Sequence, residues 1–283
     1  MICLTGDIHH ASLGTNEQRY INNPRDSEVR ISARYLDLVE NFKVKVTFYV
    51  TGKTLADEWQ DFKEISASEL VELGGHTYSG IPLGAFSKLA YRIRGRTPPS
   101  HSPTYGSRRN QRTDIRKMID IAGKRTGKDI VSWRSHGYVH DSNTYSILAE
   151  MGIKMISDEI SNTRLFPFRT SEGLISHPIN VMPDHDHIYH AHRDREFVEK
   201  AGRNGYGADA FSSDSYTVEE WGDIVEKQVV EIEKRNGLAT VLMHPICMYL
   251  ADGFKTAARL LKVFSGYKTI RAKEIPAWLN GDL

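Results

Sequence analysis

The sequence predicts an α/β protein, built as a distorted (β/α) barrel or a related wound parallel sheet. Short apolar runs typical of buried strands alternate along the chain with amphipathic segments that have helical spacing. Polar residues directly follow several of these strands, as they do at the carboxyl edge of β/α barrels, where ligands collect. The 283 residues show no repeat, low-complexity tract or domain boundary, so we expect a single domain spanning residues 1–283.

Composition and charge exclude several classes of protein. Hydrophobic residues make up 40% of the chain and charged residues 26%, which is ordinary for a soluble globular protein. The formal net charge of +1 gives no reason to expect a nucleic-acid partner. No apolar run is long enough to span a bilayer and no leader-like segment stands at the start, so we expect a cytoplasmic protein without membrane insertion. Cys3 and Cys247 lie in apolar contexts typical of free thiols.

The first half of the chain begins with a strand, a long connection, a helix and a second strand. The apolar run 2–4 predicts the first strand, and residues 27–42 have the apolar spacing of a helix. The alternating run 44–50 predicts the second strand. This order favours a parallel sheet. A further helix is predicted over 66–73, because Ser66-Ala-Ser-Glu has the residues of a helix start.

A long segment rich in arginine and proline follows at about 81–111, and it predicts an insertion in the domain. A loop of this length in a compact domain is either functional or mobile. Its arginines suit bidentate binding of phosphate or carboxylate groups, and a solvated basic loop is an equal alternative. They are Arg92, Arg94, Arg96, Arg108 and Arg109, with Arg112 just beyond.

The second half continues the alternation of strands and helices. Helices are predicted over 113–126, 142–151, 217–236 and 254–264. Strands are predicted over 129–133, 153–157, 179–183 and 238–243. Residues 160–177 have an irregular, hairpin-like pattern, and a strand with a small helix closes the chain.

Polar residues follow four of the predicted strands, and two further groups lie on loops. Any one of these residues alone is more often structural than catalytic, but their coincidence at one sheet edge predicts a functional site. Carboxylate and imidazole side chains together suit a zinc-type site. The strand-end residues are Asp7, His9, His10, Arg134, His136, Asp158 and His244, and the loop groups are His76 and the run from Asp184 to His192.

Four segments, in order, resemble the motifs of the polysaccharide deacetylase family, the NodB-homology group of carbohydrate esterase family four. Residues 44–52 resemble its second strand and the glycine after it, and residues 69–79 resemble the loop with its His-Ser/Thr-x-x-His motif. Residues 133–137 resemble its third, arginine-containing motif, and residues 241–245 resemble its last strand and histidine. The resemblance covers most of residues 1–275 and implies a distorted (β/α) barrel of the polysaccharide deacetylase type.

The resemblance also implies a mechanism. In the family a divalent metal, held by one carboxylate and two histidines, polarises an amide carbonyl and a water, while a second carboxylate acts as base and a histidine as acid. Carried over by position, Asp7 falls at the base, His76 at a metal ligand and Arg134 at the arginine that orients the base. His244 falls at the general acid. The implied cofactor is a divalent metal, with zinc the first choice.

Three departures from the family pattern stand out. The first motif has a single carboxylate, and at Asp-x-Asp spacing His9 takes the place of the metal-binding one. Position 80, four residues after His76, is glycine where the family has its second histidine. His10 or His136 could supply the missing ligand, and His136 itself replaces the family's proline. In a further alternative, Asp7 is itself a ligand and the base lies elsewhere.

The run from Asp184 to His192 has three interpretations: a metal tract, a solvated loop, or a rim that binds sugar hydroxyls. We favour the rim or an outer shell of the site, with Asp186 the first residue to test. Asp158 and His136 are the other candidates for substrate binding.

The resemblance makes an N-deacetylase the leading hypothesis, acting on a nucleotide- or lipid-linked N-acetylated sugar in cell-surface glycan or O-antigen biosynthesis. The arginine-rich insertion would suit a diphosphate. One alternative keeps the fold and hydrolyses a non-sugar amide or cyclic imide. The other is an inactive barrel that binds a carbohydrate.

Overall fold

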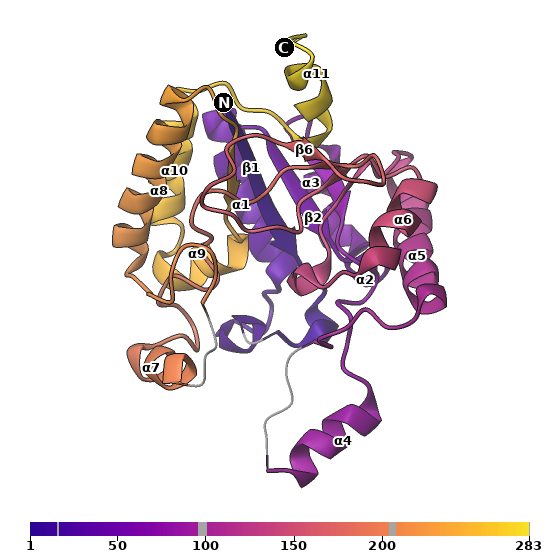
Figure 1. Ribbon diagram of the computed structural model, residues 1–283. Coiled ribbons are helices and arrows are strands. Elements are labelled where there is room, and N and C mark those ends of the chain that lie inside the picture. Colours follow the sequence, from indigo (N-terminus) through magenta and orange to yellow (C-terminus); the bar gives the residue numbers. More distant parts are fainter. Residues whose placement is uncertain (16, 96–100, 204–207, 283) are drawn as a thin grey trace.

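The computed structural model describes residues 1–15, 17–95, 101–203 and 208–282, and its centre is an eight-stranded sheet in the order β6-β7-β5-β4-β3-β2-β1-β8. All neighbours pair in parallel except β6 with β7, so the predicted parallel α/β sheet is confirmed. The sheet curls into a partly closed barrel (Figure 1). The strands are β1 (Ile2–Ile8), β2 (Val46–Val50), β3 (Val71–Gly75), β4 (Ser132–Trp133), β5 (Met155–Ile156), β6 (Phe168–Arg169), β7 (Ile175–Ser176) and β8 (Ala239–Leu242).

Helices surround the sheet. α8 packs against α10 on one side, and α5 packs against α6 on the other (Figure 1). The α-helices are α1 (Glu28–Phe42), α2 (Gly52–Asp57), α3 (Trp59–Ala67), α4 (Ala85–Ile93), α5 (Arg108–Thr126), α6 (Ser142–Glu150), α7 (Arg195–Arg203), α8 (Val218–Lys234), α9 (Pro245–Asp252), α10 (Lys255–Phe264) and α11 (Ile275–Leu279). Short 3₁₀ helices are η1 (Ala11–Leu13), η2 (Glu17–Tyr20), η3 (His136–Tyr138) and η4 (Ala272–Glu274).

The helix predicted over 66–73 is wrong beyond Ala67. α3 ends at Ala67, and β3 begins at Val71 between β2 and β4. Val71 and Leu73 are buried in the core, while the buried Glu72 accepts hydrogen bonds from Thr47 and Ser132. Pairing with both neighbours therefore outweighs the local helix signal of Ser66-Ala-Ser-Glu.

The strand predicted over 179–183 is reduced to an isolated parallel bridge between Ile179 and Ile160, and Asn180 joins this segment to its neighbours. Its side-chain nitrogen donates to the carbonyls of Arg164 and Leu238, and its side-chain oxygen accepts from the Thr240 amide. The backbone amide of Asn180 also donates to the Thr240 carbonyl, so this residue contacts the β8 region through both its backbone and its side chain. The hairpin-like pattern of 160–177 is confirmed by the antiparallel pair β6 and β7.

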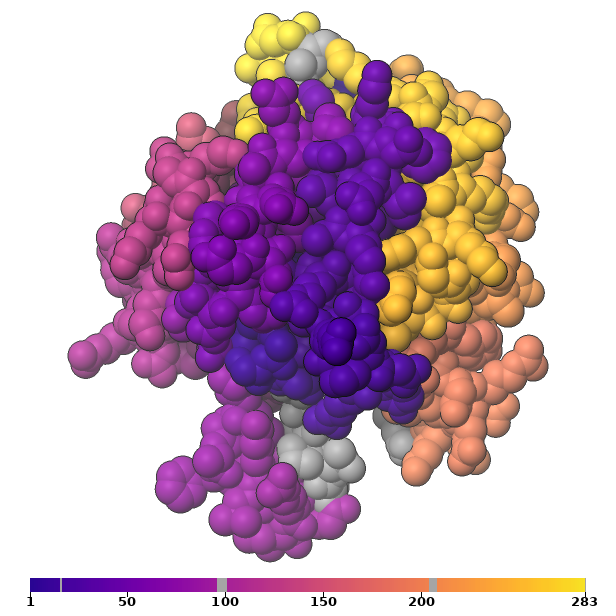
Figure 2. Space-filling view, turned by 180° about the vertical axis from the view of Figure 1, so that it is seen from behind, coloured from indigo at the N-terminus to yellow at the C-terminus, as the bar shows by residue number. Residues whose placement is uncertain are grey.

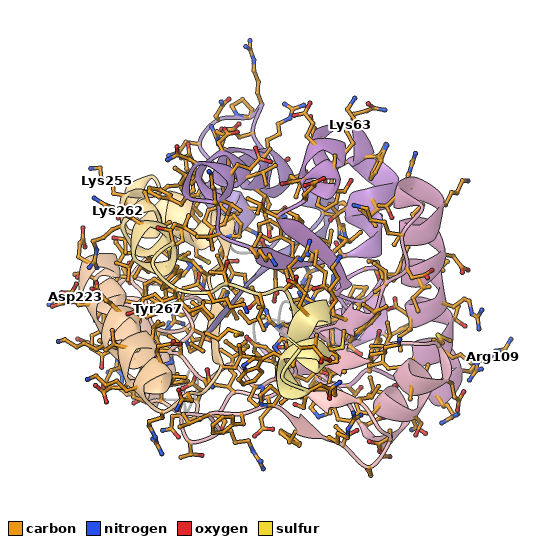
Figure 3. All side chains as sticks on the ribbon, turned by 90° about the horizontal axis from the view of Figure 1, so that it is seen from above. Lys63, Arg109, Asp223, Lys255, Lys262 and Tyr267 are labelled. Carbon is orange, nitrogen blue, oxygen red and sulfur yellow. The ribbon has the colours of Figure 1, made fainter. Side chains whose placement is uncertain are left out.

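The insertion at 81–111 contains a helix, α4, that the sequence did not indicate. α4 projects from the body of the protein with Phe86 and Ile93 exposed (Figures 1 and 2). Residues 96–100, including Arg96, lie outside the described residues. Arg108 and Arg112 pair with Glu150 on α6, and Arg109 lies on the outer surface of α5 (Figure 3). These ion pairs occupy Arg108 and Arg112, and the phosphate-binding role considered for the other arginines stays a prediction.

Charged side chains such as Lys63, Asp223 and Lys255 lie on the outside of the helical layer (Figure 3). Within the described ranges, none of the helices combines the length and apolarity needed to cross a membrane.

Gly75 marks a tight contact inside the sheet. A methyl group at this position would lie 2.3 Å and 2.4 Å from two ring atoms of Trp133, which is fully buried on the neighbouring strand. We therefore expect Gly75→Ala to lower the free energy of unfolding by about 1–3 kcal/mol through overpacking. Gly123 in α5 has open space around it, so Gly123→Ala should leave the stability unchanged or raise it by up to about 1 kcal/mol. Urea denaturation of both variants checks the contrast, and equal midpoints would contradict it.

Candidate active site

The carboxyl ends of the parallel strands bring the predicted site residues together. Asp7 lies near the end of β1, and His76, Arg134 and His244 follow β3, β4 and β8 within two residues. Asp7, His76 and His244 line a cavity of about 360 Å³, a volume suited to a small ligand. The same cavity is lined by His9 and His136.

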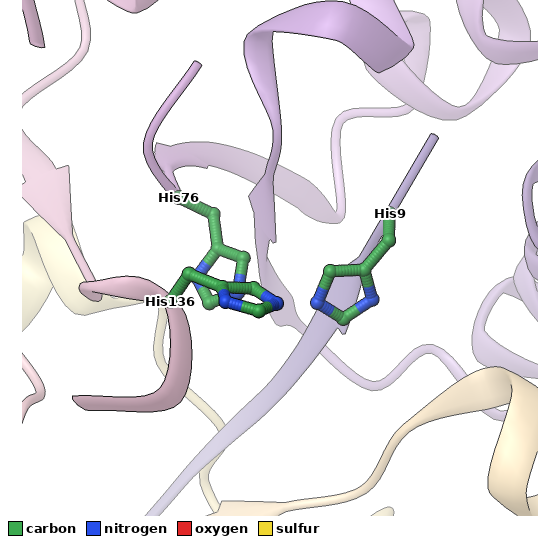
Figure 4. Close-up of side chains that lie close together, drawn as sticks. All are labelled: His9, His76 and His136. Carbon is green, nitrogen blue, oxygen red and sulfur yellow. The ribbon is translucent and has the colours of Figure 1, made fainter. Parts of the chain in front are cut away.

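Three imidazoles converge in this cavity. The ring centroids of His9, His76 and His136 lie 5.1 Å, 5.1 Å and 5.2 Å apart (Figure 4). One ring nitrogen from each lies within 4.8 Å of the others. We call these three residues the histidine triad.

Outer contacts fix the rings of the triad. The Nδ1 of His9 lies 2.8 Å from Glu28 Oε1, and the Nδ1 of His76 lies 2.8 Å from the carbonyl oxygen of Arg134. In the neutral form of either ring, these acceptors hold the proton on Nδ1, which leaves the lone pair on Nε2. Such acceptors behind a histidine are the usual support of a metal ligand.

Burial keeps the inner two members of the triad uncharged. It lowers the pKa of His76 to about 3, against the opposing effect of Asp7. It also lowers the pKa of His136 well below the ordinary value, and the neighbouring rings of His9 and His76 add to this effect. A neutral imidazole is the form that binds a metal ion.

The triad fits a divalent metal ion. Three imidazoles that share a tetrahedral zinc at about 2.0–2.1 Å per bond have ring centroids about 5 Å apart, as these have. The Nδ1 of His136 is buried and makes no hydrogen bond, and a bound ion is one way to satisfy a buried ring nitrogen. Glu28 and the Arg134 carbonyl supply the outer support. The donor set is thus three histidines, without the carboxylate of the family pattern.

Arg134 and Asp7 form a buried ion pair beside the triad. The guanidinium donates to Asp7 Oδ1 at 2.8 Å, and further bonds to Thr5 and Ser157 hold it in place. The second carboxylate oxygen, Oδ2, lies 3.8 Å from His76 Nε2 and 3.7 Å from His244 Nε2. Burial alone would raise the pKa of Asp7, but Arg134 and the two imidazoles together lower it well below its usual range. Asp7 is therefore ionised at neutral pH.

His244 is held by Asp184, a residue that the sequence did not single out. The Asp184 carboxylate is fully buried and accepts bonds from the His244 backbone amide at 2.5 Å and from its Nδ1 at 2.7 Å. Burial would lower the pKa of His244, but Asp184 and Asp7 raise it to about 10. His244 therefore carries a proton at neutral pH, with Nε2 directed toward Asp7.

Three other residues predicted for the site lie outside the group formed by the histidine triad, Asp7, Arg134 and His244. His10 turns away from the triad, and its Nδ1 lies 2.9 Å from the hydroxyl of Thr51. Asp158 accepts bonds from the amide and hydroxyl of Ser135, so it shapes the loop before His136 and does not line the cavity. Asp186 does line the cavity, 3.3 Å from the Nδ1 of His185. Of the two residues considered for the missing ligand, the structure brings His136 into the triad.

Two supporting carboxylates were missed from the sequence. Glu28 begins α1, where an acidic residue ordinarily indicates favourable interaction with the helix dipole. Asp184 begins the run interpreted as a substrate rim or an outer shell of the site, and the sequence did not indicate its pairing with His244. A buried acid paired with a site histidine can be found only once the fold places residues 28 and 184 beside residues 9 and 244.

Gly80 occupies the position where the family motif has its second histidine. Its φ of +73° is in the left-handed region, which glycine adopts without strain. A Cβ atom there would lie 2.8 Å from Leu13 Cδ1. The left-handed backbone and the close Leu13 side chain thus both favour glycine at position 80.

Comparison with known proteins gives a family match. The family model described as polysaccharide deacetylase matches residues 25–156. None of the curated protein sequences matches the chain. The matched residues make up just under half of the chain, so the chain is similar to polysaccharide deacetylases in sequence over this part and shares their fold throughout. The resemblance predicted from the sequence is thereby confirmed.

Solved structures share the fold at low identity. A protein described as a polysaccharide deacetylase from Mycobacterium smegmatis has a TM-score of 0.68 at 12% identity, over 100% of this chain and 91% of its own. The allantoinase Puue has a TM-score of 0.64 at 12% identity, over 99% and 90%. A CE4 family pseudoenzyme from Bacillus anthracis has a TM-score of 0.50 at 15% identity, over 97% and 64%. At these identities the similarity establishes the fold.

The raised pKa of His244 leads to a prediction for the metal-free protein. The NMR signals of its ring should show proton loss near pH 10, and Asp184→Asn should move this transition down toward the ordinary value of 6.5. Because the folded-state pKa is the higher one, the stabilisation from Asp184 is fully present below pH 6.5 and is lost as the pH rises to about 10. A transition near pH 6.5 in the unsubstituted protein would contradict the assignment.

Proposed function

We propose that the protein is a metal-dependent hydrolase that removes an N-acyl group, in the first instance acetyl, from an amino sugar. The proposed substrate is a nucleotide- or lipid-linked sugar of cell-surface glycan or O-antigen biosynthesis, and the cytoplasmic location expected above stays a prediction. One observation carries the proposal: three imidazoles converge beside an ionised carboxylate and a protonated histidine.

His9, His76 and His136 are the residues that would hold the metal ion. When bound, a divalent ion supplies Lewis-acid polarisation of the substrate carbonyl and lowers the pKa of a bound water. Three neutral ligands leave the full charge of the ion uncompensated, whereas the family's ligand set includes a carboxylate. Zinc is the proposed ion, since zinc commonly takes histidine ligands and occurs with three of them in catalytic sites.

Asp7 is placed to act as the base. Arg134 occupies Oδ1 and keeps the carboxylate ionised, so Oδ2 is the oxygen available to accept a proton from an attacking water. This oxygen faces the cavity between His76 and His244. The ion pair with Arg134 also prevents the carboxylate from rotating away.

His244 is placed to act as the acid. The leaving amine of an amide must receive a proton as the C–N bond breaks. His244 is protonated at neutral pH, lines the cavity and is fixed in orientation by Asp184 through Nδ1. Its Nε2 proton is therefore the one available to the leaving nitrogen. The proposed base and acid line the same cavity as the triad, with Asp7 Oδ2 3.7 Å from His244 Nε2.

Hydrolysis of a cyclic amide or imide is the second candidate. The similarity in fold to an allantoinase favours it, because that enzyme's name denotes action on a cyclic ureide on this architecture. A carbohydrate-binding barrel without turnover is the third candidate, and the similarity in fold to a protein described as a pseudoenzyme supports it. Substrate panels and metal content distinguish the three.

The substrate proposal predicts acetate release from an N-acetylated sugar. Purified protein should be incubated with UDP-N-acetylhexosamines and lipid-linked N-acetyl sugars in the presence of zinc, cobalt or nickel, with acetate measured enzymatically. Release that depends on added metal is the expected result. Activity only on small cyclic amides would select the second candidate, and metal binding without turnover on either panel would select the binding barrel.

The assignment of roles predicts two kinds of variant. His76→Ala should lose both bound metal and activity, because it removes a ligand. Asp7→Asn and His244→Ala should retain metal but lower kcat by about 10²–10⁴-fold, the usual contribution of a general base or acid. Metal content by mass spectrometry and initial rates check both. His140→Ala is the matched control, since His140 is exposed and stacks on Tyr145. Loss of metal in Asp7→Asn would make Asp7 a ligand instead.

A further inference from the structure

The helix α4, in the 81–111 insertion, concentrates exposed apolar side chains. Six large apolar side chains are exposed among the described residues, and three of them belong to α4: Phe86 (90% exposed), Leu89 (54%) and Ile93 (77%). Their spacing of three and four residues places them on one side of the helix. We call these three residues the α4 stripe. Apolar side chains gathered in this way indicate an interaction surface, whereas single exposed ones do not.

The same helix is basic. Lys88, Arg92 and Arg94 are exposed on α4 or directly after it. The sequence has no acidic residue between Glu72 and Asp114, so no negative charge within this stretch offsets them. α4 therefore presents apolar surface and positive charge together, a combination that suits an anionic partner with an apolar layer.

The insertion begins and ends at the rim of the active-site cavity. The Ser102 amide donates to the Ile81 carbonyl at 2.8 Å, which closes the insertion at its base. His101, next to this bond, lines the cavity, and its ring centroid lies 5.1 Å from that of His136. α4 projects at the end of the molecule opposite the N-terminus, which is the end toward which β1 runs (Figure 1). The α4 stripe is therefore at the same end of the protein as the cavity.

An anionic lipid bilayer fits these features. Helices with an apolar face and Lys or Arg beside it bind in the interface of anionic membranes, where the apolar side chains enter the boundary between headgroups and acyl chains. Because α4 projects from the body, it can reach a flat surface ahead of the rest of the protein (Figure 1). α4 has nine residues, far fewer than the about 20 needed to span a bilayer, so the contact is peripheral.

We propose that α4 is a docking element that holds the protein on an anionic membrane surface. The α4 stripe enters the lipid interface, and Lys88, Arg92 and Arg94 contact the acidic headgroups. Docking brings the cavity close to the bilayer, which favours the lipid-linked sugars among the substrates proposed above. This last step rests on the proposed function, whereas the docking itself does not.

Vesicle binding tests the proposal. Full-length protein, without added metal or substrate, is centrifuged with vesicles of phosphatidylcholine alone or of phosphatidylcholine with about 30% phosphatidylglycerol, which gives an anionic surface. We expect binding to the anionic vesicles and much weaker binding to the neutral ones. Binding should also weaken as the salt concentration rises, because salt screens the attraction between the basic side chains and the headgroups.

Two variants with matched controls locate the contact. Lys88→Gln should lower the partition coefficient for anionic vesicles about fivefold, the usual effect of one basic residue at such a surface. Leu89→Ala should lower it about tenfold, because less apolar area enters the interface. The controls are Lys255→Gln on α10 (Figure 3) and Leu279→Ala on α11, where Leu279 is 44% exposed. Both controls should bind as the unsubstituted protein does, and circular dichroism confirms that each variant is folded.

Equal binding to neutral and anionic vesicles at low salt, or no binding to either, would overturn the proposal. Unchanged binding in both Lys88→Gln and Leu89→Ala would do the same. A dimer that Leu89→Ala disrupts, in protein that binds no vesicles, would also overturn it and assign the α4 stripe to a second copy of the chain. Vesicle binding without hydrolysis of any lipid-linked sugar supports the docking and contradicts the proposed function. Hydrolysis of such a sugar without vesicle binding supports the function and overturns the docking.

Discussion

The arrangement of the site depends on the buried guanidinium of Arg134. Its side chain donates to Asp7, Thr5 and Ser157, its carbonyl accepts from His76, and its amide bonds to the Gly75 carbonyl. One residue therefore sets the carboxylate and one triad histidine relative to each other across four strands. The ring of Tyr49 lies beneath the guanidinium at 4.4 Å. Removing one partner of such a buried pair typically costs about 3–5 kcal/mol, because the other charge is left uncompensated.

Histidine side chains take two different charge states within this cavity. Burial without a sufficiently close carboxylate leaves His76 and His136 neutral, and Asp184 keeps His244 protonated. The neutral rings can bind a metal ion and the charged ring can donate a proton. The surroundings of each histidine, which set its pKa, thus decide whether the ring suits metal binding or proton donation.

The sequence predicted the parts of the site that depend on local pattern. Asp7, His76, Arg134 and His244 could be found because each directly follows or ends an apolar run, and parallel strands bring such positions to one edge. Glu28 and Asp184 could not, since their partners lie 19 and 60 residues away. His9 and His10 are adjacent and equally plausible as ligands from sequence, but the turn after β1 directs one toward the triad and the other toward Thr51. The helix predicted over 66–73 failed because pairing of β3 on both sides outweighs local propensity.

Gly80 limits which residues can supply the third imidazole beside His9 and His76. A histidine introduced there to restore the family motif would need a left-handed backbone and would collide with Leu13. His136 meanwhile already fills the place beside His9 and His76. A histidine at position 80 would therefore also require a change at Leu13 and a strained backbone. The local structure around Gly80 thus favours a ligand set in which the third imidazole comes from residue 136.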